Sequence, residues 1–174
     1  MTAIAELSAM PHVTVMPRTT IFGWYDDNIF GAVERVNDHV LEPSPYEPRQ
    51  RYWRIMAKRA VMATGAEERP IVFGGNDVPG VMTAGAMRTY ANRYAAAAGK
   101  SVVVFTNNNS GQRTAQHLRA HGIHVEAVID PRKSGDVIVN VRGGERVTAV
   151  ELNGHRVIPC DAVAMSGGWS PIVN

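Results

Sequence analysis

The sequence predicts an α/β fold, in which a unit built on a parallel sheet carries an attached β-meander and follows a β-rich segment. The first observation is the run SVVVFTNNNSGQRTAQHLRAHGIHVEAVID at residues 101–130, which has the order strand, turn, helix, strand of a βαβ unit. The second is a series of β-rich runs within residues 137–159, separated by the turn dipeptides Gly143-Gly144 and Asn153-Gly154. The third is that the first ~65 residues hold short β-rich runs and no pattern of a long helix.

The β-rich segment contains several candidate strands. The runs HVTVM, TTIFGWY and IFGAVERV alternate over residues 12–36, and Asp26-Asp27-Asn28 reads as a hairpin turn between the last two. Residues 41–49 hold three prolines (LEPSPYEPR), which predicts an exposed loop. Residues 51–64 predict two further strands with a turn at Lys58-Arg59.

A Gly/Pro-rich connector follows at residues 65–81, and we place the domain boundary there, giving domains 1–69 and 70–174. Thr83 can cap a helix over about residues 84–98, which Gly99 ends. Its predicted apolar face, at i, i+3, i+4 spacing, consists of Met87, Tyr90, Ala91, Tyr94 and Ala98. A last buried strand is expected at residues 162–165.

Composition limits the classes of function. The chain has 174 residues, 45% of them apolar, and a net charge of +2 with acids and bases interspersed, so no nucleic-acid partner is expected. The sequence contains no run of ~18 apolar residues, so no membrane span is expected. The first ten residues lack the features of a signal peptide, and the single Cys160 excludes an internal disulfide. These features favour a cytoplasmic location.

The turn of the βαβ unit bears on dinucleotide binding. Against the fingerprint G-x-G-x-x-G it reads T-x-N-x-x-G, so only the third glycine is kept. The following helix still offers free N–H groups to an anion, and Asn tolerates unusual backbone angles. The turn therefore predicts a dinucleotide-binding site, with a decayed site as the open alternative. Its residues are Thr106, Asn107, Asn108, Asn109, Ser110 and Gly111.

Asp130 ends the second strand of the unit, about twenty residues after the turn, where a carboxylate accepts the ribose hydroxyls of NAD. The neighbouring Arg132 and Lys133 can reverse this preference for NAD over NADP, and Asp130 can equally be a simple turn residue. Gly65 and the pair Gly167-Gly168 follow buried strands, where glycine is typical of close approach by a ligand or another backbone.

Other candidate sites have weaker support. His117 and His121 stand at i, i+4 spacing but lack a third ligand nearby, which favours a surface helix over a metal site. Cys160 reads as a small buried hydrophobe. No pattern indicates a Ser-His-Asp or Cys-His nucleophile, so neither a catalytic nor a metal-ligating residue is predicted.

The order of these motifs resembles the flavoprotein disulfide-reductase-like superfamily and, within it, the alpha subunit of heterotetrameric sarcosine oxidase. The resemblance covers nearly the whole chain. It rests on the runs MPRTTIFGWYD (16–26), ATGAEERP (63–70), FTNNNSG (105–111), VIDPR (128–132) and CDAVAMSGGWSP (160–171). It implies a Rossmann-like NAD-binding domain over 70–174 and a β-rich remnant of a second, FAD/NAD-binding domain over 1–69, as an internal fragment of a longer subunit. The motif positions imply that Thr106, Asn108, Gly111 and Asp130 line the nucleotide, and that Gly65, Gly167 and Gly168 lie at the crossings between domains.

The resemblance also implies a function for the parent enzyme. Such enzymes oxidise the N-methyl group of sarcosine, giving glycine, hydrogen peroxide and formaldehyde or methylene-tetrahydrofolate. FAD and FMN belong to the complete enzyme, with the amine-oxidising flavin expected on the beta subunit. This chain alone is then expected to retain no flavin and to be inactive, and its unpaired strand edges make a homodimer conceivable.

Two rival functions remain open. One is a scaffold whose vestigial nucleotide pocket positions the catalytic beta subunit. The other is a self-sufficient pyridine-nucleotide reductase, which needs a redox C-x-x-C motif or a flavin fingerprint that this sequence lacks.

Overall fold

The computed structural model of the protein describes residues 2–173 and separates the chain into two compact units, divided between Ala63 and Thr64. The predicted boundary, between residues 69 and 70, falls slightly further along, inside the second unit. The reason is that residues 66–68 form a strand that pairs with residues 169–171 of the same unit. That the first unit is part of a nucleotide-binding domain stays a prediction.

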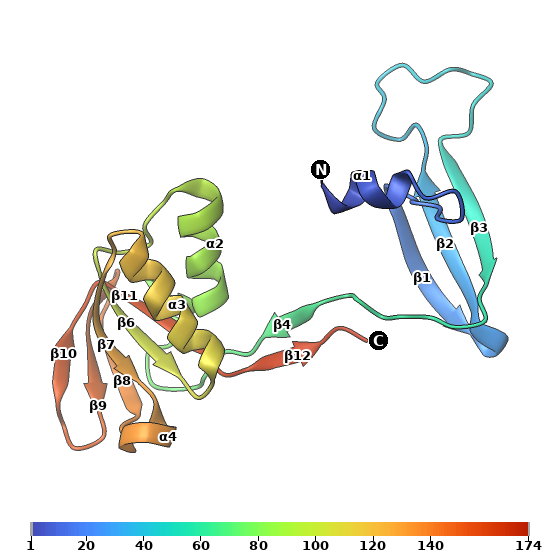
Figure 1. The fold of residues 1–174 in the computed structure, drawn as a ribbon. Coiled ribbons are helices and arrows are strands. Elements are labelled where there is room, and N and C mark those ends of the chain that lie inside the picture. The colour runs from blue at the N-terminus through green and yellow to red at the C-terminus, as the bar shows by residue number, and fades with distance from the viewer. Residues whose placement is uncertain (1, 174) are drawn as a thin grey trace. The chain divides into compact units, whose positions relative to one another are not determined.

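The first unit is built on a three-stranded antiparallel sheet of order β1-β2-β3 (Figure 1). The predicted hairpin turn is confirmed, and it contains Asp27 and Asn28 at φ of 58° and 54°, angles that Asp and Asn adopt more readily than most residues. Two sequence predictions are wrong here, because residues 12–16 form no strand and residues 51–64 contain one strand instead of two. A short helix was also missed. The elements are α1 (Ala3–Ser8), β1 (Thr19–Tyr25), η1 (Asp26–Asn28), β2 (Ile29–Arg35) and β3 (Gln50–Met56).

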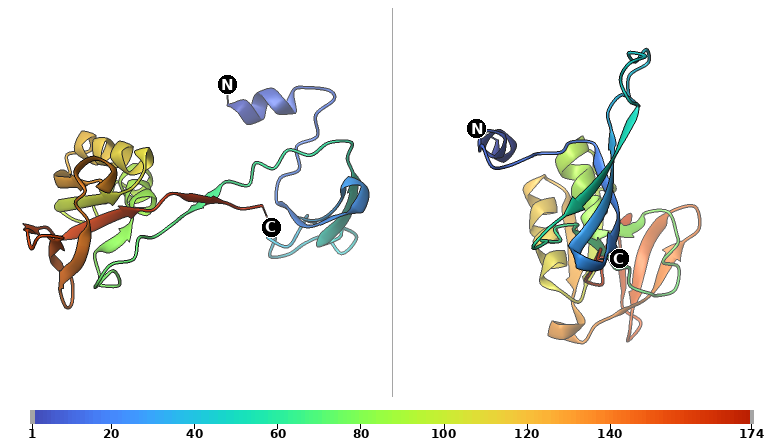
Figure 2. Two further views of the ribbon diagram at one scale, coloured as in Figure 1. Left: turned by 90° about the horizontal axis from the view of Figure 1, so that it is seen from below. Right: turned by 90° about the vertical axis from the view of Figure 1, so that its right-hand side faces the viewer.

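The second unit has three layers, which confirms the α/β fold with a parallel sheet and a β-meander. A parallel sheet of order β5-β11-β6-β7 carries helices α2 and α3 on one face and the antiparallel meander β8-β9-β10 on the other (Figure 2). The sheet and helix elements are β5 (Val81–Thr83), α2 (Ala84–Tyr94), β6 (Ser101–Thr106), α3 (Asn109–Ala120), β7 (His124–Ile129), α4 (Pro131–Ser134) and β11 (Ala162–Ser166). The meander strands are β8 (Ile138–Gly143), β9 (Val147–Leu152) and β10 (Val157–Pro159).

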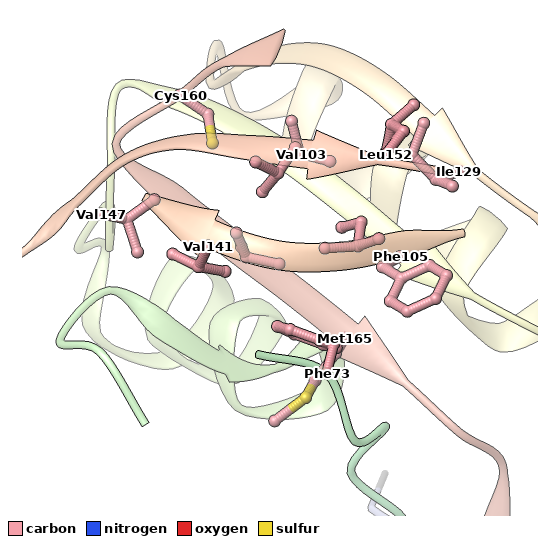
Figure 3. Packing of buried hydrophobic residues seen from close by; sticks show 12 residues of the cluster. Phe73, Val103, Phe105, Ile129, Val141, Val147, Leu152, Cys160 and Met165 are labelled. Carbon is pink, nitrogen blue, oxygen red and sulfur yellow. The ribbon is translucent and has the colours of Figure 1, made fainter. Parts of the chain in front are cut away.

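The two-residue period of the strands divides the core into two clusters. On β6, Val102 and Val104 pack toward the helices, whereas Val103 and Phe105 pack toward the meander. Figure 3 shows Phe105 and Val103 among the side chains of the meander cluster. Because both faces of the sheet are covered, β6 and β11 are buried along almost their whole length, and the ends of these strands are held rigidly.

The predicted start of helix α2 is confirmed, but its predicted end is wrong. Thr83 accepts a hydrogen bond from the amide of Ala86 at 3.4 Å, as a helix cap. The helix ends at Tyr94 because Ala95 takes the left-handed conformation, at φ 50°, before Gly99 is reached. Tyr90 and Tyr94, expected on the apolar face, are exposed.

Two short strands, β4 (Ala66–Glu68) and β12 (Trp169–Pro171), form an antiparallel pair that we call the β4–β12 ribbon. Gly65 directly precedes β4, and Gly167 and Gly168 directly precede β12. The prediction that Gly65 follows a buried strand is wrong, because residues 57–65 form no strand, whereas Gly167 does follow the buried strand β11. Gly65 and Gly168 both have positive φ, of 82° and 102°, which explains glycine at these positions. Gly167 lies so close to another segment that an added Cβ would be 2.8 Å from the carbonyl oxygen of Arg69.

Candidate functional site

The turn between β6 and α3 keeps the tight helix-to-strand contact that the third fingerprint glycine provides. A Cβ on Gly111 would overlap the Oγ1 and Cβ atoms of Thr106, so only glycine fits there. Thr106 stands at the first glycine position and is fully buried. Its hydroxyl accepts from the backbone amide of Asn108 at 3.1 Å and lies 3.0 Å from the carbonyl oxygen of the same residue. The turn is therefore shaped by a buried hydroxyl where the fingerprint has a bare backbone.

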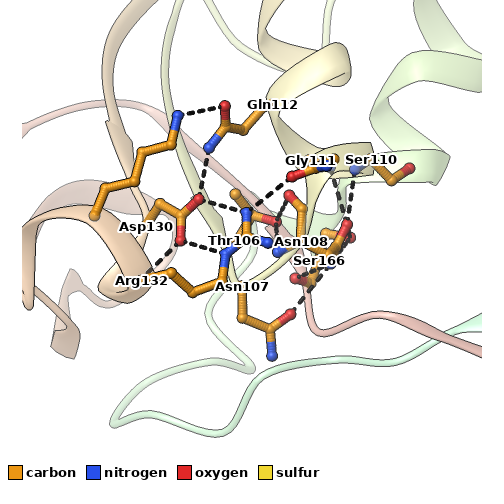
Figure 4. Close-up of polar contacts among 11 residues, drawn as sticks. Thr106, Asn107, Asn108, Ser110, Gly111, Gln112, Asp130, Arg132 and Ser166 are labelled. Atoms are coloured by element: carbon orange, nitrogen blue, oxygen red, sulfur yellow. Dashed lines mark hydrogen bonds and ion pairs between the residues drawn. The ribbon is translucent and has the colours of Figure 1, made fainter.

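The Asn108 side chain closes the N-terminus of α3 (Figure 4). Its Oδ1 accepts hydrogen bonds from the backbone amides of Ser110 at 2.9 Å and Gly111 at 3.3 Å. This is the bonding of a helix N-cap, which satisfies donors that the first turn of a helix leaves free. These amides are the groups that would face the diphosphate in a dinucleotide site.

The other end of the same carboxamide ties the turn to the neighbouring strand β11. Asn108 Nδ2 donates to the carbonyl oxygen of Ser166 at 2.9 Å and lies 3.1 Å from the Ser166 hydroxyl, which is fully buried. The backbone amide of Asn107 also donates to the Ser166 carbonyl at 3.3 Å. Asn108 thus joins the ends of β6 and β11 at the edge of the sheet where ligands bind in open α/β folds.

Asp130 lies at the end of β7, as predicted, but its carboxylate is fully engaged by protein groups. The Arg132 guanidinium donates to Oδ1 from Nε at 2.9 Å and to Oδ2 from Nη2 at 2.7 Å. The Gln112 side chain donates to Oδ2 at 2.6 Å, and the Arg132 backbone amide donates to Oδ1 at 3.1 Å, which makes Asp130 the N-cap of α4.

This environment holds Asp130 in its charged form. The hydrogen bonds from the Arg132 side chain lower the pKa of Asp130 well below its ordinary value, and burial opposes this only in part. The Gln112 side chain lowers that pKa further. A ribose hydroxyl would find a charged carboxylate, yet one with both oxygens already accepting from protein donors.

In this conformation the Ser110 and Gly111 amides are not free for a dinucleotide. Both donate to Asn108 Oδ1, so a phosphate oxygen would have to displace that carboxamide. Gly65, Gly167 and Gly168 lie on or beside the β4–β12 ribbon, whereas the six turn residues and Asp130 gather at the ends of β6 and β7. The assignment of all ten residues to a cofactor site stays a prediction.

A cavity of about 210 Å³ adjoins this network between α3 and β7. Its lining is polar and apolar in about equal parts, and it includes both Asp130 and Gln112. Lys133 Nζ donates to Gln112 Oε1 at 2.8 Å across its rim. The lining residues are Gln112, Ala115, Gln116, Arg119, Val128, Asp130, Lys133 and Ser134.

Sequence reasoning missed three residues of this network. Gln112 and Ser166 were not proposed as site residues, and Arg132 was considered only for its effect on cofactor preference. Their one local signal is position, since Ser166 ends β11 and Gln112 and Arg132 lie in the first turns of α3 and α4, at the same edge of the sheet. Their partners stand up to 58 residues away in the sequence, so no local pattern reveals them.

The remaining candidates have structural explanations. The rings of His117 and His121 stack at 6.3 Å on α3, and His121 Nδ1 lies 2.9 Å from the carbonyl oxygen of His117. Burial raises the pKa of the Cys160 thiol to about 11, which keeps it unreactive. Among residues 2–173, no three His, Cys, Asp or Glu side chains gather in a way suited to a metal ion. Over the same residues, none of the helices has both the length and the apolar character that a bilayer crossing requires.

The chain is a homologue of part of the sarcosine oxidase alpha subunits, which confirms the predicted resemblance. It is 49% identical, over 97% of its length, to the sarcosine oxidase subunit alpha of Rhizobium meliloti (strain 1021), and 38% identical, over 98%, to that of Corynebacterium sp. (strain P-1). The chain spans about a fifth of the length of these relatives, 19% and 21% respectively. Among solved structures, L-proline dehydrogenase from P. horikoshii matches with a TM-score of 0.65 and 25% identity, over 90% of this chain and 28% of that one. No family model matches the sequence.

Proposed function

We propose that this chain contributes a structural, Rossmann-like module to the alpha subunit of a sarcosine-oxidising flavoenzyme, and that its βαβ turn is closed by Asn108 instead of holding NAD. Sarcosine as the substrate of the whole enzyme is inferred from the names of the relatives. Flavin chemistry, which removes a hydride equivalent from the amine, is assigned to other parts of that enzyme. The module's own part is to present a rigid sheet edge against which the beta subunit or the rest of the alpha subunit is positioned.

The Asn108 side chain is the observation that carries this proposal. A phosphate oxygen can reach the Ser110 and Gly111 amides only after the carboxamide gives up its hydrogen bonds to them. Turning away also costs its bonds to Ser166, which is buried. A phosphate would replace the acceptor at the two amides, so the net cost of opening the turn is the loss of the two contacts to Ser166, about 1 kcal/mol each.

Asp130 supports the same conclusion. Its two oxygens accept from Arg132 and Gln112, so a ribose hydroxyl would have to replace one of these donors. A ribose hydroxyl that replaces Arg132 would bring no positive charge to the carboxylate, so the exchange weakens the interaction. The two groups that the fingerprint assigns to a dinucleotide are thus both used for internal structure.

A dinucleotide-binding module is the second candidate. It is favoured by the βαβ topology and by the glycine at position 111. It is also favoured because the side chain that closes the helix N-terminus, Asn108, is neutral and can rotate away more easily than a charged one. In that case Asn108 acts as a removable cap, and NAD binding is weakened but kept.

A thermal-shift titration of the full chain with NAD separates the two candidates. At an NAD concentration of about 100 times Kd, binding adds about 2.7 kcal/mol to the free energy of unfolding. We expect no NAD-dependent shift for the wild type and a gain of binding for Asn108→Gly, because glycine frees both amides. A saturable NAD-dependent shift in the wild type contradicts the closed turn, and an increase of that shift in Asn108→Gly favours the second candidate, a removable cap.

The role in amine oxidation is tested with the same purified chain. We expect no sarcosine-dependent formation of hydrogen peroxide by the chain alone. The side chains at the candidate site cannot themselves accept the hydride equivalent that amine oxidation removes. Sarcosine turnover by this chain without other subunits would overturn the proposal that the chemistry lies elsewhere.

A further inference from the structure

Glu68 connects the β4–β12 ribbon to the first turn of α2. Its Oε2 accepts a hydrogen bond from the backbone amide of Gly85 at 2.5 Å. Gly85 is the second residue of α2, and Glu68 lies on β4, 17 residues earlier in the sequence. The contact therefore joins α2 to a strand that pairs only with β12 and not with the parallel sheet.

The lack of a side chain at Gly85 makes this contact possible. A Cβ there would lie 2.6 Å from Glu68 Oε2 and 3.3 Å from Cη2 of Trp169. Glu68 and Trp169 face each other as partners in the ribbon. One side chain from each strand thus lies over the same glycine, and the ribbon is seated on α2 through both.

The charge of Glu68 suits this position. The first turn of α2 has no acidic residue of its own, and a carboxylate is favourable at the positive end of a helix. Oε1 of Glu68 is buried and has no hydrogen-bond partner among the described residues. A buried oxygen without a partner costs free energy. Glu68 is therefore better explained by its contact between the ribbon and α2 than by a gain in net stability.

We propose that Glu68 is a positioning residue that fixes the β4–β12 ribbon to α2 and so sets the direction in which both strands leave the parallel sheet. The backbone alone holds the ribbon weakly, because each strand has only three residues. The inference does not depend on whether the β6–α3 turn binds a dinucleotide, since Glu68 contacts neither that turn nor Asp130.

Hydrogen exchange of the full chain tests this inference through two amides that border the ribbon and that we count with it, those of Arg69 and Gly167. The amide of Arg69 donates to Gly168, and the amide of Gly167 donates to Arg69, both at 2.8 Å. In Glu68→Ala we expect these two amides and that of Gly85 to exchange about tenfold faster, the effect of losing one charge-assisted hydrogen bond. The amides of β6 should keep their protection.

Three further variants make the test specific. Glu67→Ala removes an exposed carboxylate from the same strand and should leave exchange unchanged. Glu68→Gln keeps an acceptor oxygen and should restore most of the protection. Gly85→Ala keeps Glu68 but displaces its carboxylate, so ribbon exchange should rise about tenfold while α2, which gains a better helix former, becomes no less protected. Ribbon exchange in Glu68→Ala equal to wild type, or an equal rise at all amides including β6, would overturn the inference.

Discussion

The N-terminus of α3 is closed by a residue of its own turn, whereas the N-terminus of α2 is closed partly by a residue from a distant strand. At α3, Asn108 accepts from the amides two and three residues ahead. At α2, the local cap Thr83 makes one long bond of 3.4 Å, and Glu68 of the ribbon supplies a second acceptor at 2.5 Å. Both helix ends have the same need for acceptors, and it is met once locally and once through tertiary structure.

The difference has a consequence for ligand binding. A helix N-terminus at the carboxyl edge of a parallel sheet is an anion site only while its amides are free. At α3 a single neutral side chain removes that property, and at α2 the same effect is produced by a carboxylate. Comparing variants at the two helix ends therefore measures how much each closure contributes to the free energy of unfolding and how much it weakens anion binding.

The largest effect is expected at the glycine that lets α3 approach β6. In Gly111→Ala the new Cβ overlaps Thr106, whose side chain is fully buried and cannot move aside. We expect a loss of about 3 kcal/mol in the free energy of unfolding, the upper range for overpacking. Guanidinium unfolding followed by the helical circular-dichroism signal measures it.

The double variant Thr106→Gly, Gly111→Ala is the control for that clash. It removes Oγ1, Cβ and Cγ2 of Thr106, the atoms nearest to the new Cβ, so part of the loss should be recovered and the two changes should be strongly non-additive. Additive effects would show that Gly111 is needed for some other reason than its contact with Thr106.

Asp130→Asn sharpens the comparison by removing a charged cap, that of α4. Asn cannot pair with Arg132 as a carboxylate does, so we expect a loss of about 2 kcal/mol near neutral pH. The effect should depend on pH. Because the pKa of Asp130 is lowered on folding, its contribution is complete above the ordinary value of 3.8 and is lost as the pH falls below it.

The measurement is the difference in unfolding free energy between wild type and Asp130→Asn across a pH series. That difference should be constant from neutral pH down to about 5 and should shrink in more acidic solution. A difference that stays constant below pH 4 means that the charge of Asp130 is not what stabilises this part of the fold.

Asn108→Ala tests the local closure of α3 directly. It removes the acceptor for the Ser110 and Gly111 amides and the donor to Ser166, so we expect a loss of about 1.5 kcal/mol. Asn108→Asp keeps the acceptor but places a carboxylate against the Ser166 carbonyl. If Asn108→Asp is as stable as wild type, the link to β11 contributes nothing and only the helix cap matters.

The sequence predicted the second unit well because its signals are local. The buried run Val102–Phe105, the turn dipeptides of the meander and Thr83 as a helix cap all act over a few residues. The errors arose where short β-rich runs had no partner to pair with, as at residues 12–16, or where Ala95 ended α2 ahead of a glycine. Propensity is a weak guide in such segments because tertiary contacts decide them.

The places of the turn and of Asp130 in the fold were predicted from the sequence, but their hydrogen-bond partners were not, and their role in a cofactor site stays a prediction. The turn and Asp130 were identified from spacing alone, and they do lie at the ends of adjacent strands. Whether Asn108 faces a ligand or caps its own helix depends on Ser166, and the state of Asp130 depends on Gln112. Glu68 was missed altogether, because its partner Gly85 belongs to another element and no periodicity links the two.

The smallest effect is expected from Thr83→Ala, which removes the local cap of α2. Its hydrogen bond to Ala86 is long, at 3.4 Å, and Glu68 still accepts from the neighbouring Gly85 amide. We therefore expect a loss of only about 0.5 kcal/mol, the low end for an N-cap, by the same guanidinium unfolding. In a Glu68→Ala background the same change should cost about 1 kcal/mol or more, because no acceptor then remains at the first turn. An equal cost in both backgrounds would mean that the remote carboxylate does not share the task of the local cap, and the contrast between the two helix ends would be lost.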